Sequence, residues 1–105
     1  MTLEEFKLVL DRAGVPVAYN HFHEGQSPAP PFIVYQEKED ETFYADGVPY
    51  YTVKKINVEL CTDEKEPALE AKLQAALTGA GICYKKYEGY LESEKMYESL
   101  YECEV

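Results

Sequence analysis

The chain has 105 residues, and its 20 acidic residues outnumber its 10 basic residues to give a formal net charge of −10. This length fits a single domain with one hydrophobic core, so residues 1–105 are expected to form one domain. The negative charge would repel a polyanion, so no direct nucleic-acid binding is expected. The sequence also lacks the run of ~20 apolar residues that a transmembrane helix needs, so no membrane partner is expected.

The first residues, "MTLEEFKLVL", predict a helix and not a secretory signal. Two acids stand where a signal would carry positive charge, so we expect a soluble protein that is intracellular where it is made. Thr2 and Glu5 have the spacing of a capping box. Apolar residues then recur at intervals of three and four, and Gly14 follows them. The pattern predicts a helix over residues 3–13.

The next segments predict a short edge strand and a long hairpin. The stretch "VPVAYNHF" is short and contains a proline, which is typical of an edge strand. A proline-rich loop follows, and a strand then begins at Phe32. Asp46-Gly47 predicts a two-residue type I′ turn into the strand "YYTVKKINVELCT". The pairs that this turn imposes are Ile33 with Leu60, Tyr35 with Val58 and Phe43 with Tyr50.

The hairpin register places the apolar residues of both strands on one face, as a half-buried hairpin requires. The middle of the hairpin is polar, with residues 39–41 expected opposite residues 52–54. We therefore expect the base of the hairpin to pack on the core and its tip to project beyond the core.

The second half of the chain predicts one more helix and two more strands. In "DEKEPALEAKLQAALTGAGI", Pro67 lies at the first helical position and an apolar stripe follows it, which predicts a helix over residues 67–80. Two strands are expected from Ile82 and from Lys95. The expected fold is α+β, with an antiparallel sheet packed by two helices in two layers and the order α-β-β-β-α-β-β.

The two histidines of the chain are the strongest candidates for metal ligands. His21 and His23 would lie on the same face of a strand, and Glu24 is an adjacent acid. A catalytic zinc site needs a third ligand and supporting hydrogen bonds, and no other histidine exists to supply them. We therefore expect no metal and no cofactor. The alternative from a different class is a small cytoplasmic metal-binding enzyme that uses these three residues.

The remaining sequence carries no catalytic signature. It has no phosphate-binding loop, dinucleotide fingerprint or G-x-S-x-G motif. Cys61, Cys83 and Cys103 are far apart in sequence and have no activating base nearby, so we expect three reduced thiols. The protein is not expected to be an enzyme.

Three segments, "FYADG", "VELCTDEKEPALE" and "YLESEKMYE", carry a resemblance that covers nearly the whole chain. The chain resembles the tail completion, or tail terminator, proteins that prophages of Gram-positive bacteria encode in the head–tail region of siphophage-type genomes. This resemblance implies a non-enzymatic virion protein that forms a ring, with the hexamer as the expected assembly. The ring would cap the tail tube and meet the head connector, in the virion or in the host cytoplasm during assembly. The alternative is another head–tail connector or a minor tail protein.

Aromatic residues flank the predicted turn, and tyrosines are typical both of strands and of protein–protein interfaces. A hairpin tip buries little surface in a small domain, so we expect these rings to form a contact surface. The alternative is that the tip folds back onto its own sheet. Two apolar residues on the charged face of the last strand would be covered either by a neighbouring subunit or by a helix. The expected contact residues are Phe43, Tyr44, Asp46, Tyr50, Tyr51, Met96 and Leu100.

Overall fold

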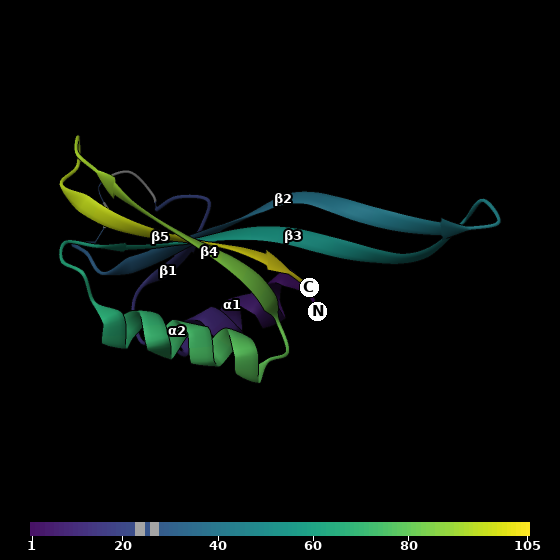
Figure 1. The fold of residues 1–105 in the computed structure, drawn as a ribbon, viewed down its shortest axis with the longest axis horizontal. Helices are drawn as coiled ribbons and strands as arrows, with labels where there is room; N and C mark the ends of the chain where they lie inside the picture. The colour runs from purple at the N-terminus through teal and green to yellow at the C-terminus, as the bar shows by residue number, and fades with distance from the viewer. Residues whose placement is uncertain (23–24, 26–27) are drawn as a thin grey trace.

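The structure is a computed structural model and describes every residue except 23–24 and 26–27. Two helices and a five-stranded sheet with the strand order β1-β2-β3-β5-β4 form the fold (Figure 1). The elements in chain order are α1 (Leu3–Asp11), β1 (Val17–Tyr19), β2 (Phe32–Ala45), β3 (Val48–Thr62), α2 (Pro67–Gly79), β4 (Cys83–Leu91) and β5 (Met96–Glu104). The α+β class, with two helices and a mostly antiparallel sheet, is confirmed.

The first helix begins with the predicted capping box. The Thr2 hydroxyl accepts a hydrogen bond from the Glu5 amide at 3.1 Å, and the Glu5 carboxylate accepts one from the Thr2 amide at 3.0 Å. Both bonds satisfy amides that have no partner within the helix. The helix ends two residues earlier than predicted, and Gly14 adopts a φ of 77°, which glycine tolerates without strain.

One strand pair differs from the expected antiparallel sheet. β1 runs parallel to β2, with Val17 opposite Ile33 and Tyr19 opposite Tyr35. Parallel neighbours need a long connection, because the chain must return to the end of the sheet from which it started. The proline-rich segment after β1 provides this return, so β2 begins beside the start of β1. The parallel pair therefore depends on the path of a loop and not on the strand sequences.

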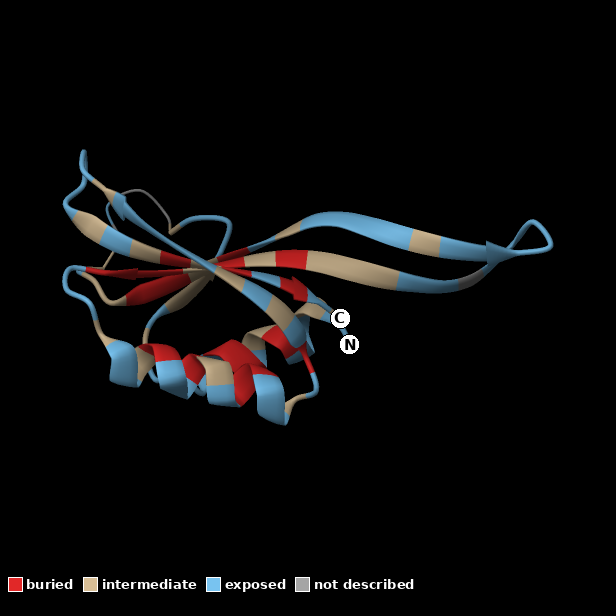
Figure 2. Cartoon of the chain, viewed as in Figure 1, coloured by how far each residue is buried: buried red, intermediate tan, exposed pale blue. Residues whose placement is uncertain are grey.

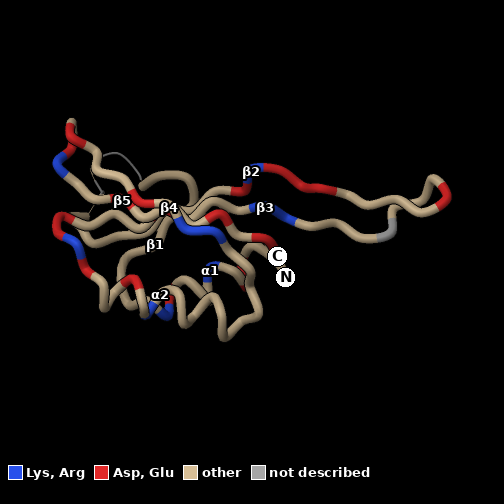
Figure 3. The backbone as a smooth tube through the Cα atoms, viewed as in Figure 1, with Lys and Arg blue, Asp and Glu red and all other residues tan. Residues whose placement is uncertain are grey.

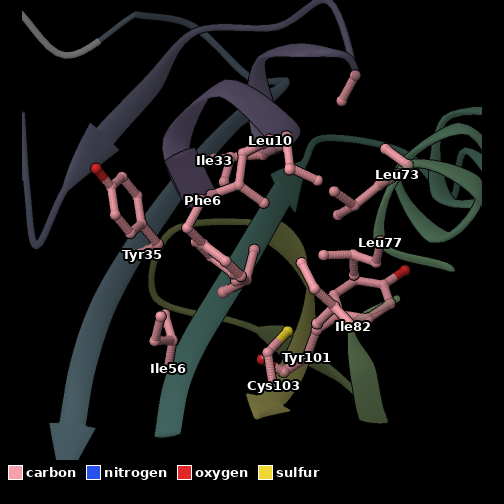
Figure 4. Packing of buried hydrophobic residues seen from close by; sticks show 14 of the residues in the cluster. Phe6, Leu10, Ile33, Tyr35, Ile56, Leu73, Leu77, Ile82, Tyr101 and Cys103 are labelled. Carbon is pink, nitrogen blue, oxygen red and sulfur yellow. The ribbon is translucent and has the colours of Figure 1, made fainter. Parts of the chain in front are cut away.

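The hydrophobic core lies between the helices and one face of the sheet (Figures 1 and 2). Phe6 and Leu10 of α1 and Leu73 and Leu77 of α2 have no exposed surface, which confirms the apolar stripe of each predicted helix. Tyr101 of β5 is also fully buried, beneath α2 (Figure 4). The sheet residues of the core include Ile33, Tyr35, Ile56, Val58, Leu60 and Cys103.

The β2–β3 hairpin extends beyond the rest of the sheet (Figure 1). β5 pairs with β3 from Lys55 to Thr62, and its last contact beyond that range joins Lys54 and Val105 through two backbone hydrogen bonds of 2.9 Å. Past this point the hairpin has two strands alone, which gives the molecule an elongated shape of 50 × 29 × 23 Å. We call residues 39–54 the arm.

The buried position of Leu73 generates a stability prediction. Leu73→Ala should lower the free energy of unfolding by ~2–5 kcal/mol, because it removes a fully buried side chain and leaves a cavity under the sheet. Chemical denaturation followed by circular dichroism measures this change. The control is Leu8→Ala on α1, where the side chain is 64% exposed and the expected change is within ~0.5 kcal/mol. Equal losses in the two variants would contradict this account of the core.

Candidate functional site

The arm ends in the turn that the sequence predicts. Asp46 and Gly47 have φ values of 53° and 75°, and both are positive as a type I′ turn requires. The predicted pairs Ile33–Leu60 and Tyr35–Val58 at the base are also confirmed. The predicted pair of Phe43 with Tyr50 is wrong, because Phe43 lies opposite Tyr51.

Two register shifts explain this correction. One lies on β2 between Glu37 and Glu39, and the other lies near the tip, where Tyr44 pairs with Pro49. Each shift leaves one extra residue, Lys38 on β2 and Tyr50 on β3, so the two shifts cancel and the register outside them is the predicted one. Bulges of this kind cannot be inferred from alternation alone, because they change the pairing by one residue without changing the turn.

Charge pairing accounts for the register between the two bulges. Glu39 lies opposite Lys55 and Asp40 lies opposite Lys54, in place of the expected partners at positions 52–54. The Lys55 ammonium lies 3.5 Å from the Glu39 carboxylate and 3.2 Å from that of Glu41. Opposite charges directly across a strand pair stabilise it. Glu39 and Glu41 of the acidic run of β2 therefore pair with Lys55 of β3.

Aromatic residues dominate the end of the arm. The rings of Phe43 and Tyr51 stack at 4.7 Å with an interplanar angle of 19°, and next to them the Thr42 and Thr52 hydroxyls lie 3.1 Å apart. Phe43 is 39% exposed, Tyr51 50% and Tyr44 66%. The alternative in which the tip folds back onto its own sheet is wrong, because the arm points away from the sheet (Figures 1 and 2). The side chain of Tyr50 lies outside the described part of the structure.

The arm also carries an excess of negative charge near its base (Figure 3). The carboxyls of Glu37 and Asp40 are close enough to share a hydrogen bond, which raises the pKa of Glu37. Lys54 partly offsets this effect at 3.7 Å from Glu37. Two carboxyls thus share a single lysine among the described residues, so an additional cation would be stabilising here.

Met96 and Leu100 lie on the sheet face opposite the helices. The buried residues of β5 are Ser99, Tyr101 and Cys103, which occupy alternate positions to Met96 and Leu100 and point towards the helices. The alternative in which Met96 and Leu100 pack under a helix is therefore wrong. Both are half-buried, and the intervening Glu98 has its pKa raised, chiefly by burial. The structure does not bring these residues together with the aromatic end of the arm.

The candidate metal ligands are not assembled among the described residues. His21 is exposed just after β1, and His23 and Glu24 lie outside the described part of the chain. Within that part, no group of three or more histidine, cysteine, aspartate or glutamate side chains is placed to hold a metal ion. The expected absence of a metal therefore stays a prediction.

The three cysteines are free thiols in different surroundings. Burial raises the pKa of both Cys61 and Cys103 to about 12, which disfavours the nucleophilic thiolate. Cys83 is exposed at the start of β4. The two buried thiols therefore act as small apolar side chains.

An ion-pair cluster joins α2 to β4, and sequence reasoning did not find it. Glu70 is 5% exposed and pairs with Lys65 at 2.9 Å and with Lys86. Glu88 pairs with the same two lysines, which lower its pKa to about 2. No local sequence signal could have found the cluster, since its members come from a loop, a helix and a strand. Its residues neutralise one another, so the cluster holds α2 against the sheet.

Two of the surface hollows that the described residues form differ in character. A mixed-charge cleft of about 680 Å³ on the face opposite the helices is lined by Lys38, Lys55, Lys85 and Glu102, among other residues. An apolar groove of about 540 Å³ lies between α1 and the β1 edge and is lined by Leu3, Leu8, Tyr19 and Tyr35, with Glu4 and Lys7. Neither brings an activated nucleophile and a base together.

Comparisons with known proteins do not assign a family to the chain. No protein-family model and no curated protein matches the chain. Within the described residues, no helix is long and apolar enough to cross a membrane.

Thiol labelling should separate the three cysteines. A disulfide reagent should modify Cys83 rapidly in the native protein, because burial and a raised pKa protect Cys61 and Cys103. The expected result is one labelled thiol per native chain and three after denaturation. Cys83→Ser should abolish the rapid phase. Rapid labelling that survives in this variant would contradict the burial of the other two thiols.

The ion-pair cluster predicts a pH dependence of stability. The folded protein holds the pKa of Glu88 at about 2, below its ordinary value of 4.5. The resulting stabilisation is fully present above pH 4.5 and is lost as the pH falls towards 2. Glu88→Gln should reduce this acid-side loss of unfolding free energy, measured by denaturation at several pH values. Glu92→Gln in the exposed β4–β5 turn is the control, and an equal effect there would contradict the assignment.

Proposed function

We propose that the protein is a non-enzymatic assembly protein of phage type, which acts as a tail terminator at the head–tail junction. It caps the end of the tail tube as a ring of identical subunits, as the resemblance of its sequence implies. The arm is the part of each subunit that makes the docking contact.

The observation that carries this proposal is the exposed aromatic end of the arm. An isolated two-stranded hairpin is at best marginally stable in water, because it has no core of its own. The stacked pair of Phe43 and Tyr51 partly offsets this cost but leaves much of both rings in solvent. A partner surface would cover the rings, and aromatic anchors commonly contribute much of the binding energy at interfaces. A docking role explains both the length of the arm and its composition.

The chemically reactive side chains elsewhere in the protein support this function better than an enzymatic one. The buried thiols are held in the neutral form, and the buried glutamate is neutralised by lysines. The metal-binding alternative has its one described residue, His21, in an exposed position. A contact role for Met96 and Leu100 stays a prediction, as does the alternative of another connector or a minor tail protein.

The test is to remove the aromatic pair and measure docking. Phe43→Ser with Tyr51→Ser should leave the helices, the core and the melting temperature nearly unchanged, because both rings lie outside the core. The double variant should fail to cap tail tubes assembled from the major tail protein encoded with it, whereas the unmodified protein should form a ring at tube ends. Negative-stain electron microscopy of the mixtures measures both outcomes.

A matched control is available on the same molecule. Leu8→Ser with Tyr19→Ser also removes two large exposed side chains, which are 64% and 46% exposed, but these lie on α1 and β1, away from both the arm and β4. We expect this variant to keep capping. Failure of the unmodified protein to bind tube ends would overturn the proposed function, and unfolding of the arm variant would place its rings in the core.

A further inference from the structure

Two of the strand edges that have no strand partner among the described residues are long and carry consecutive charged residues. β4 forms one end of the sheet and pairs with β5 alone, along its length from Cys83 to Leu91. The other is the outer edge of β2 in the arm, since β1 covers β2 from Ile33 to Tyr35 alone. Each edge presents a row of backbone donors and acceptors that can pair with another strand.

The two edges carry opposite charges. The arm edge has the consecutive acids Glu39, Asp40 and Glu41, all exposed, and Asp40 takes part in no ion pair among the described residues. The middle of β4 has the consecutive lysines Lys85 and Lys86. The exposed Lys85 likewise has no ion pair there, whereas Lys86 pairs with Glu70 and Glu88.

Consecutive residues of a strand point to opposite faces of a sheet. Two adjacent acids on one strand can therefore meet two adjacent lysines on the other, with one acid–lysine pair on each face of the joined sheet. This holds for either orientation of one sheet's faces relative to the other's. This arrangement would supply a second cation beside the Glu37–Asp40 carboxyl pair, which has Lys54 alone among the described residues. Opposite-charge pairs across neighbouring strands are stabilising, and like charges there are destabilising.

We propose that the β2 edge of the arm adds to the free β4 edge of a second copy of this chain. Backbone hydrogen bonds extend the sheet from one subunit to the next, and the acids of the arm lie beside the lysines of β4. The contact joins two different surfaces, so each subunit uses its arm on one neighbour and its β4 edge on the other. Such a head-to-tail contact produces a ring when the rotation closes. This inference rests on the docking role of the arm and names its partner.

Charge reversal on each edge tests the inference. Asp40→Lys reverses the charge of an arm residue that has no ion pair among the described residues, and Lys85→Glu reverses the charge of a β4 residue that likewise has none there. Either change should weaken self-association by about tenfold or more, because like charges would face each other. Both substitutions together should restore association to near that of the unmodified chain. Sedimentation velocity of the full chain over a range of concentrations measures the assembly, and circular dichroism checks folding.

Salt and a second control sharpen the test. Self-association of the unmodified chain should weaken as sodium chloride increases, because the contact pairs exposed charges. Lys72→Glu on α2, away from both edges, should associate like the unmodified protein. A monomeric unmodified chain at every concentration, association unaffected by either reversal, or no recovery in the combined variant would each overturn the inference. Retained capping of tail tubes that requires Phe43 and Tyr51 would then still support the proposed function.

Discussion

The structure depends on one constraint, which is the length of β2 and β3. Both strands are longer than the other strands of the sheet and extend beyond the helices that cover it. The base of this hairpin lies in the middle of the sheet, where Ile33 and Val58 are fully buried beneath the helices. That burial anchors the hairpin, since a two-stranded ribbon alone is marginal in water. The arm is stabilised by the ion pairs of Glu39 and Glu41 with Lys55 at its base and by the stacked aromatic pair near its tip. A rigid base with a solvent-exposed end is suited to reaching a partner.

The two ends of the hairpin are stabilised by different physical effects, and this difference separates folding from docking. Apolar burial under α1 and α2 contributes most at the base, where the loss of one leucine leaves a cavity. In the arm, exposed ion pairs contribute little each and are screened by salt. Substitutions at the end of the arm can therefore change binding without unfolding the sheet. Under the proposed function, the docking surface can therefore vary independently of the core.

The net charge of this protein does not show how its charged residues pair locally. The chain is acidic overall, yet Lys65 and Lys86 hold the buried Glu70, and Lys55 pairs with Glu39 and Glu41 of the arm. The acids left over at the base of the arm and the exposed lysine of β4 lie on two of the free strand edges. Pairing of these edges between copies would use the same cross-strand interaction that sets the register within the arm.

The sequence by itself determined the elements whose signals are local. The capping box, the apolar stripes of both helices and the Asp46-Gly47 turn depend on neighbouring residues, and each lies where the pattern predicts it. Tertiary structure alone decided the parallel β1–β2 pair, the two bulges that place Phe43 opposite Tyr51, and the cluster around Glu70. It also decided which face of β5 the helices cover. These features depend on the path of a loop or on contacts between distant segments, and hydrophobic periodicity contains no information on either.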